Sequence, residues 1–197
     1  MSDEATIRVY DQRAGEYAGL TDGYNSADPQ LAAFIAAVPA GGRVLDLGCG
    51  PGTAAAAMAR AGLVVQAVDA SAEMVALAAR HPGVTARQAT FNDITEVAAY
   101  DGIWANFSLL HAARADFPRH LAALHRALKP GGVFHIGMKL GQGEGRDRLG
   151  RHYSYYGEDE LKILLRDAGF TVTGHRLGSG TGLDGTVSDW IVVAAHA

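Results

Sequence analysis

The chain of 197 residues lacks several features that would place it in a specialised class. It has one cysteine, Cys49, so it can form no internal disulfide, and a reducing compartment is expected. It has no surplus of positive charge, because 17 Lys and Arg face 21 Asp and Glu, which argues against a globally basic nucleic-acid-binding protein. No apolar run approaches the ~20 residues that span a bilayer, and Asp3 and Glu4 stand where a signal peptide would be apolar. We therefore expect a cytoplasmic protein with neither a nucleic-acid nor a membrane partner.

The composition is that of a globular protein, with 48% hydrophobic and 19% charged residues. The length fits a single domain over 1–197, in which we expect an N-terminal helical cap at 1–40 and an α/β core at 41–197. In the cap, Ile7, Tyr10, Ala14 and Tyr17 recur at helical spacing, and the pair Asp28-Pro29 begins a second helix.

Short apolar runs and helical stripes alternate along the core. The pattern predicts strands at 43–47, 63–68, 84–89, 102–105 and 133–138, with helices after most of them. A last helix near 161–168 is followed by two strands, 170–177 and 187–195, with no helix between them. Alternating β and α elements predict a parallel sheet covered on both faces, and the closing pair predicts an antiparallel strand at the end.

The sharpest pattern is the segment 44–53, VLDLGCGPGT, in which an apolar strand runs into glycines and then into a helix. Open α/β sheets bind ligands at this carboxyl edge. Gly48 and Gly50 would let a ligand approach the backbone, because glycine has no Cβ. Asp69 ends the next strand, where a carboxylate can accept hydrogen bonds from both hydroxyls of a ribose.

Asp46 distinguishes between two kinds of ligand. The G-x-G-x-x-G pattern of dinucleotide sites needs a third glycine where this chain has Thr53. A carboxylate at Asp46 would also repel a pyrophosphate, whereas it suits a ligand with a cationic amine and a sulfonium. This combination favours S-adenosylmethionine (SAM) over a nicotinamide dinucleotide.

Residues 44–53 resemble the first motif of class I SAM-dependent methyltransferases. The resemblance continues through Asp69 in VVQAVDAS, YDGIWANFSLLH at 100–111 and LKPGG at 128–132. The sequence GEGRD at 143–147 is similar to that of a subgroup of small bacterial enzymes. The family implies an α/β fold with a doubly wound, mostly parallel seven-stranded sheet, a Rossmann-like methyltransferase fold whose last strand is antiparallel, and an N-terminal helical lid. It also implies SAM as cofactor and S-adenosylhomocysteine (SAH) as product.

The resemblance assigns the cofactor site residue by residue. Asp46 would bind the methionine amine, Gly48 and Gly50 would admit the methionine moiety, and Asp69 would hold the ribose. Met74 would line one face of the adenine, unless it is simply a core residue. The family often has an Asp after the third strand; this chain has Thr90, which leaves the adenine-amine contact open among Thr90, Phe91 and Asn92. The predicted cofactor-binding residues are Asp46, Gly48, Gly50, Asp69, Ala70, Met74, Thr90, Phe91 and Asn106.

A sulfonium methyl donor carries its own leaving group, so the protein mainly aligns the nucleophile and excludes water. A general base is needed only when the nucleophile is protonated. His111, just after the fourth strand, is the candidate catalytic residue; the alternative is a histidine that packs the turn. Methyltransferases of nucleic-acid bases often carry Asn-Pro-Pro-Tyr at this edge, and the Phe-Ser-Leu that follows Asn106 argues against that substrate.

Two segments are candidates for the acceptor site. The predicted substrate loop at 139–156 is rich in basic residues and tyrosines, and a lining of this kind suits an anionic or zwitterionic acceptor; the alternative is a structural ion-pair network. The stretch Y-D-x-x-A-x-x-Y at 10–17 resembles a lid helix of the family, whose aromatic faces can attract a sulfonium. The predicted substrate-binding residues are Tyr10, Tyr17, Lys139, Arg146, Tyr153 and Tyr156.

We therefore predict a SAM-dependent methyltransferase that acts on a small-molecule acceptor without a metal. Three other functions remain open from the sequence: a non-catalytic SAM-binding regulatory protein, an NAD(P)-dependent reductase, and an RNA methyltransferase that uses the local basic patch at 139–156.

Overall fold

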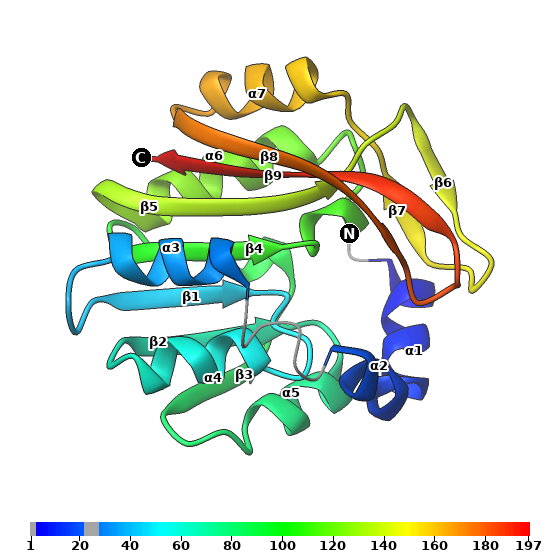
Figure 1. Cartoon of the computed structure of the whole chain (residues 1–197), viewed down its shortest axis with the longest axis horizontal. Coiled ribbons are helices and arrows are strands. Elements are labelled where there is room, and N and C mark those ends of the chain that lie inside the picture. The colour runs from blue at the N-terminus through cyan, green and yellow to red at the C-terminus, as the bar shows by residue number, and fades with distance from the viewer. Residues whose placement is uncertain (1–2, 22–27) are drawn as a thin grey trace.

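The computed structural model describes residues 3–21 and 28–197 (Figure 1). Its centre is a seven-stranded sheet with the strand order β3-β2-β1-β4-β5-β9-β8. Strands β1 to β5 pair in parallel, and β9 runs antiparallel to both β5 and β8. The sheet strands are β1 (Arg43–Leu47), β2 (Val64–Asp69), β3 (Val84–Gln88), β4 (Tyr100–Asn106), β5 (Leu128–Lys139), β8 (Thr171–Thr181) and β9 (Val187–His196). This arrangement confirms the predicted fold class, including the antiparallel last strand.

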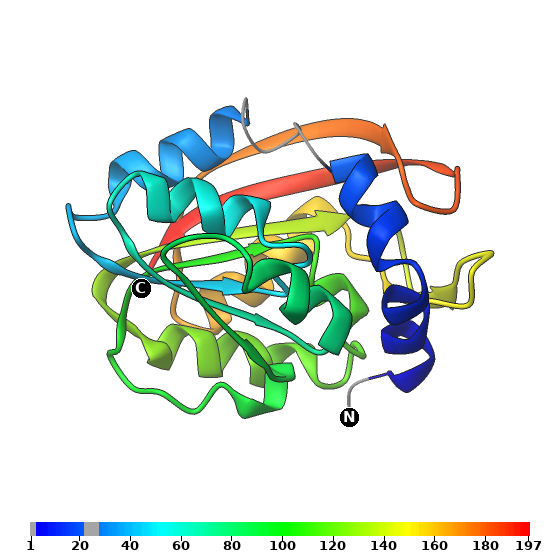
Figure 2. The ribbon, with the colours of Figure 1, turned by 90° about the horizontal axis from the view of Figure 1, so that it is seen from below.

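Helices cover both faces of the sheet (Figure 2). Successive residues of a strand point to opposite faces, so Val44 faces one hydrophobic cluster and Leu45 the other. The cluster with Val44 is closed by α3 (Pro29–Ala37), α4 (Thr53–Arg60) and α5 (Ala72–Ala78). The cluster with Leu45 is closed by α6 (Phe117–Ala127) and α7 (Glu158–Asp167).

Local sequence explains where several helices begin. The Asp28 carboxylate accepts the backbone N–H of Gln30 at 2.8 Å and caps α3, whose first residue is the predicted Pro29. The Ser71 hydroxyl accepts the N–H of Met74 at 3.2 Å and caps α5 directly after β2. The Ser71 cap therefore fixes the short turn between β2 and α5.

The N-terminal region differs from the prediction in the number of its helices. The single helix expected at 7–17 is two helices, α1 (Glu4–Gln12) and α2 (Ala14–Thr21), which meet at Arg13. The second N-terminal helix, α3, packs on the core, where Phe34 lies edge to face on Trp104 at 5.3 Å. Helices α1 and α2 lie at the carboxyl end of the strands, and the division into a cap at 1–40 and a core at 41–197 remains a prediction; residues 1–2 and 22–27 of that cap lie outside the described part (Figure 1).

The predicted substrate loop at 139–156 contains a small hairpin, in which β6 (Glu144–Arg146) pairs antiparallel with β7 (His152–Ser154). Figure 1 shows this hairpin at the same end of the sheet as α1 and α2. The two segments therefore frame the carboxyl edge of the sheet, where the glycine-rich turn lies. Among the described residues, no helix is long and apolar enough to cross a membrane.

Candidate functional site

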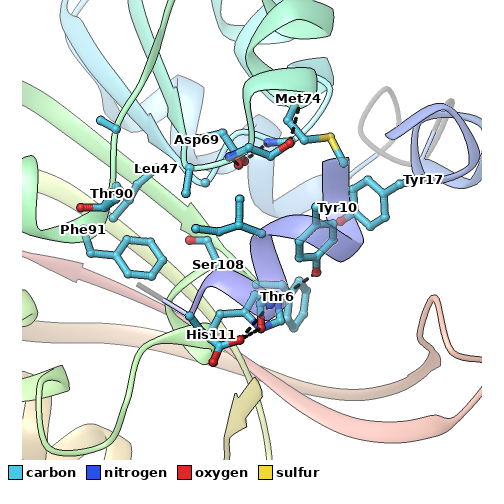
Figure 3. A pocket seen from close by; sticks show the side chains of 18 of the residues that line it. Thr6, Tyr10, Tyr17, Leu47, Asp69, Met74, Thr90, Phe91, Ser108 and His111 are labelled. Atoms are coloured by element: carbon cyan, nitrogen blue, oxygen red, sulfur yellow. Dashed lines mark hydrogen bonds between the residues drawn. The ribbon is translucent and has the colours of Figure 1, made fainter. Parts of the chain in front are cut away.

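A cavity with an empty volume of about 770 Å³ lies between the carboxyl ends of the strands and helix α1 (Figure 3). Figure 3 shows Asp69 and Met74 on one side of the cavity, and Thr6, Tyr10 and His111 on another. The predicted site residues that line it are Tyr10, Tyr17, Gly48, Gly50, Asp69, Ala70, Met74, Thr90, Phe91, Asn106 and His111. The lining residues that the prediction missed are Asp3, Thr6, Ile7, Leu47, Ser71, Ala89, Phe107 and Ser108.

The turn after β1 requires glycine for its conformation and for space. Gly48 has φ +71°, and a Cβ there would lie 2.3 Å from the Cβ of Ser108. Gly50 has φ +53°, and its Cβ would lie 3.4 Å from the Tyr17 ring. Gly48 is therefore closed to larger residues by the clash and by its conformation, and Gly50 is disfavoured for them by its left-handed conformation alone.

Asp69 connects β2 to the glycine turn. Its Oδ2 accepts the N–H of Gly50 at 2.9 Å, and its Oδ1 accepts the N–H of Ser71 at 2.9 Å. Burial raises the pKa of this carboxyl group, while the backbone hydrogen bonds oppose the shift. Each carboxylate oxygen has a second lone pair, so the group can hold the turn and still accept hydrogen bonds from a bound ligand.

Asp46, near the carboxyl end of β1, is 2% exposed, and unlike the other predicted cofactor-binding residues it does not line the cavity. Its Oδ2 has no hydrogen-bond partner among the described residues. Burial is the main cause that raises its pKa to about 7, and the charge of Asp69 adds to the shift. A buried carboxylate oxygen without a donor is costly, so this position calls for a cation or a hydrogen-bond donor.

The strands that follow place further polar groups at the wall. The Thr90 hydroxyl donates to Asp93 at 2.8 Å and caps a short 3-10 helix (Phe91–Asp93). The hydrogen-bonding capacity of Thr90 is therefore largely taken up within its own turn. Beyond β4, the Ser108 hydroxyl is buried without a hydrogen-bond partner in the described part of the chain. Phe107 beside it has φ +54°, a conformation that is uncommon outside glycine.

Asn106 is oriented by a histidine from the neighbouring strand. The His135 ring stacks on Trp104 at 3.7 Å, and burial lowers the pKa of His135 to about 3, so the ring is neutral. His135 Nε2 lies 3.1 Å from Asn106 Oδ1, and this amide oxygen can only accept the hydrogen bond. The Asn106 amino group is thereby left as a donor at the cavity wall.

His111 lies in a short 3-10 helix (Leu109–His111) and is hydrogen-bonded through both ring nitrogens. Nδ1 is 2.6 Å from the His152 carbonyl oxygen, and Nε2 is 2.9 Å from the Tyr10 hydroxyl. Arg151 donates to the same hydroxyl at 2.9 Å, and Asp147 binds Arg151 at 2.6 Å. Burial lowers the pKa of His111 to about 3. His111 lines the wall beside Tyr10, while both of its ring nitrogens are used in hydrogen bonds within the protein, so a catalytic role for His111 remains a prediction.

The predicted substrate-binding residues within 139–156 do not line the cavity. Arg146 is exposed and bonds Asp3 of α1 at 2.7 Å, and the Lys139 ammonium lies 4.4 Å from the Tyr153 ring centroid. Tyr156 is buried against Phe117, at a ring distance of 4.6 Å. Substrate binding by Lys139, Arg146, Tyr153 and Tyr156 remains a prediction, and the ion-pair alternative describes the observed partner of Arg146.

Helix α1 is fastened to the body at both ends. At one end the Thr6 hydroxyl accepts the N–H of His152 at 2.8 Å. At the other end the Asp11 carboxylate accepts the hydroxyl of Ser71 at 2.6 Å. The helix therefore bridges the hairpin and the start of α5, and it forms a wall of the cavity between them. In the described part of the chain, no cluster of His, Cys, Asp or Glu side chains could hold a metal ion.

Comparisons with known proteins identify the family of the chain. A family model described as "Methyltransferase domain" matches residues 44–132. The cypemycin N-terminal methyltransferase of a Streptomyces species is 34% identical over 140 residues, which cover 68% of this chain and 56% of that protein. A ubiquinone/menaquinone biosynthesis C-methyltransferase of Rubrivivax gelatinosus is 39% identical over 107 residues, which cover 51% of this chain and 40% of that protein. The chain thus matches about half the length of these two relatives.

The fold is also similar to those of solved methyltransferase structures. The 1,6-didemethyltoxoflavin-N1-methyltransferase of Burkholderia thailandensis, solved with 1,6-didemethyltoxoflavin and SAH, superposes with a TM-score of 0.71 at 24% identity. The match covers 96% of this chain and 87% of that chain. The fold and the glycine turn define a Rossmann-like methyltransferase domain. The chain belongs to the class I SAM-dependent methyltransferase family, as its motifs predicted, and the cofactor of this family is SAM.

Proposed function

We propose that this protein binds SAM in the cavity and transfers its methyl group to a small-molecule acceptor. The observation that carries the proposal is the buried Asp46 carboxylate, whose Oδ2 lacks a partner among the described residues. Asp46 lies two residues before Gly48, where a side chain would clash with Ser108. This acid and turn fit a ligand that carries a cationic amine. They would disfavour the pyrophosphate of a nicotinamide dinucleotide.

The remaining wall fits the other parts of SAM. Asp69 would accept hydrogen bonds from the ribose hydroxyls while it holds the N–H groups of Gly50 and Ser71. Met74 and Phe91, which both line the cavity, would enclose the adenine ring. Asn106 would offer its amino group as a donor next to the methionine moiety. Ala70 would contribute backbone alone.

The protein's part in the reaction is binding and orientation. When bound, SAM supplies an activated methyl group whose leaving group is a neutral thioether. The rings of Tyr10 and Tyr17, 5.6 Å apart, would face the sulfonium and stabilise its charge. Helix α1 would exclude water from the reacting atoms, because it closes the cavity between the hairpin and α5.

The charges at the wall bear on the nature of the acceptor. The basic residues of 139–156 suggested an anionic or zwitterionic acceptor, but the charged side chains that line the cavity in the described part of the chain are Asp3 and Asp69. A buried anion without a cationic partner is costly. We therefore favour an uncharged acceptor with aromatic or apolar surface. A cytoplasmic location and the absence of a nucleic-acid partner are part of the same proposal.

The experiment that tests this function follows SAH production. Purified protein is incubated with methyl-labelled SAM and two panels of small aromatic compounds, one uncharged and one carrying carboxylates or phosphates. We expect SAH and a labelled product from members of the uncharged panel, and loss of turnover in Asp69→Ala but not in Asp167→Ala, an exposed acid at the end of α7. Binding of SAM without turnover on either panel would instead support a non-catalytic SAM-binding protein.

A further inference from the structure

The hydrogen bonds around Tyr10 and His111 have forced directions. A carbonyl oxygen can only accept, so the His152 carbonyl 2.6 Å from His111 Nδ1 places the ring proton on Nδ1. In the neutral ring Nε2 must then accept, and its donor is the Tyr10 hydroxyl at 2.9 Å. Arginine can only donate, so Arg151 uses one lone pair of the Tyr10 oxygen.

This arrangement leaves one lone pair on the Tyr10 oxygen, at a wall of the cavity that Tyr10 and His111 share. His111 itself has no nitrogen free for a substrate, because both are occupied. A proton released by a methyl acceptor in the cavity would therefore be taken up by the Tyr10 oxygen and not directly by His111. Arg151 cannot turn away easily, since it is 2% exposed and bound to Asp147.

We propose that Tyr10 is a catalytic residue that takes the proton of a hydroxyl acceptor and passes its own proton to Nε2 of His111. The inference rests on the proposed function and names the chemical class of the acceptor, an uncharged molecule with an O–H group. The acceptor oxygen forms the bond to the methyl carbon, the bond from that carbon to sulfur breaks, and its electron pair stays on sulfur. The acceptor proton moves to the Tyr10 oxygen as the phenolic proton moves to Nε2.

The charge of the site is unchanged by this transfer. Before the reaction the positive charge is on sulfur and His111 is neutral; afterwards the thioether is neutral and the imidazole is charged. A buried imidazole with a pKa of about 3 is a weak base. The imidazole is nevertheless basic enough, because the hydroxyl oxygen, once it has gained a methyl group and still holds its proton, is a far stronger acid than the imidazolium. The same low pKa keeps Nε2 of His111 unprotonated over the physiological pH range, so Nε2 can take the Tyr10 proton throughout that range.

The surroundings of His111 agree with this role. Its charged neighbours are Arg151 and Asp147, whose effects on the imidazole oppose each other. The other titratable groups that face it are His152, Tyr10 and Tyr153; the Tyr153 ring centroid lies 4.6 Å from that of His111. Burial holds the pKa of both tyrosines above the usual value, so Tyr10 keeps its proton until the acceptor supplies another.

The first test needs no acceptor. Nitrogen NMR of the SAH complex reports the tautomer and charge of the His111 ring between pH 5.5 and 8. We expect a neutral ring with its proton on Nδ1 at every pH, and a changed Nε2 signal in Tyr10→Phe, which removes the donor. Tyr155→Phe is the matched control, because Tyr155 does not line the cavity. A proton on Nε2, or a charged ring at pH 6, would overturn the relay.

The second test uses an uncharged hydroxyl acceptor that yields SAH in the assay above. At saturating SAM we expect Tyr10→Phe to lower the single-turnover rate at least tenfold, and about 100-fold in the range of general base catalysis. Its SAM affinity should stay within twofold of wild type. We also expect a wild-type kcat that is flat from pH 8 to 5.5, whereas a histidine of ordinary pKa would lose activity below about 6.5. A loss of less than tenfold would refute the role of Tyr10. Failure of SAH to bind would instead refute the proposed function, and turnover confined to amines would refute the hydroxyl class.

Discussion

Replacement of Asp46 by asparagine should make the protein more stable and its SAM binding weaker at the same time. Asp46 is 2% exposed, and its Oδ2 has no partner among the described residues. Burial raises its pKa from 3.8 to about 7. At about 1.4 kcal/mol for each tenfold change in the ionisation constant, the charged form costs the ligand-free protein about 4 kcal/mol. Asparagine keeps the shape and removes that charge.

The sign of the pH dependence follows from the raised pKa. The favourable contribution of protonated Asp46 is complete below pH 3.8, declines as the pH rises, and is lost above about pH 7. The stability gained by Asp46→Asn should therefore be close to zero at pH 4 and largest at pH 8. Because asparagine also leaves an amide group buried, we expect a gain of about 2–4 kcal/mol at pH 8.

Urea unfolding of both proteins at pH 4, 6 and 8 gives this difference directly. Asp167→Asn is the control, because the same change is made at an exposed position far from the cavity. In parallel, calorimetry should show SAM affinity reduced by about 10- to 150-fold, since a hydrogen bond to a charged group contributes about 1.5–3 kcal/mol. A variant that is less stable than wild type at pH 8, or a stability gain that does not vary with pH, would refute the account of Asp46.

Two further variants test the walls of the cavity. Gly48→Ala should destabilise the protein by about 2–4 kcal/mol, because a left-handed residue and a Cβ 2.3 Å from Ser108 are both unfavourable. The added change Ser108→Gly should recover the steric part in denaturant titrations, and no recovery would show that the clash is not the cause. Arg146→Ala should lower the melting temperature only slightly and leave SAM affinity unchanged, because Arg146 is exposed and bonds Asp3. Arg146 holds the pKa of Asp3 well below its usual value, so this small effect should be present at pH 7 and vanish in strong acid. A large loss of affinity would return Arg146 to the binding site.

The sequence predicted the features that depend on local pattern. The glycine turn, the position of Asp69 and the helix start at Asp28-Pro29 follow from the order of residues within a few positions, and the structure has each of them as expected. The alternation of strands and helices likewise predicted the sheet. These signals are local because hydrogen bonding of a turn or cap involves neighbours in the chain.

The rest depends on contacts between distant segments. Tyr10 meets His111 across 101 positions, and Arg146 meets Asp3 across 143. The family resemblance predicted a lid helix at 10–17, but no window of sequence shows these partners. The missed residue Asp3 did leave a signal. It caps α1 by accepting the N–H of Thr6, a pairing at three positions that is typical of a helix start. The left-handed conformation of Phe107 left no such signal.

The most direct test of the central claim is calorimetric titration of SAH and of NAD into the wild-type protein and into Asp69→Ala at pH 8. The account predicts one site for SAH with a micromolar dissociation constant and no heat from NAD. In Asp69→Ala the loss of a charge-assisted hydrogen-bond acceptor should weaken SAH binding by about 1–3 kcal/mol, roughly 5- to 150-fold. Binding of NAD without binding of SAH would contradict the account outright, and unchanged SAH affinity in the variant would show that the ribose does not lie at Asp69.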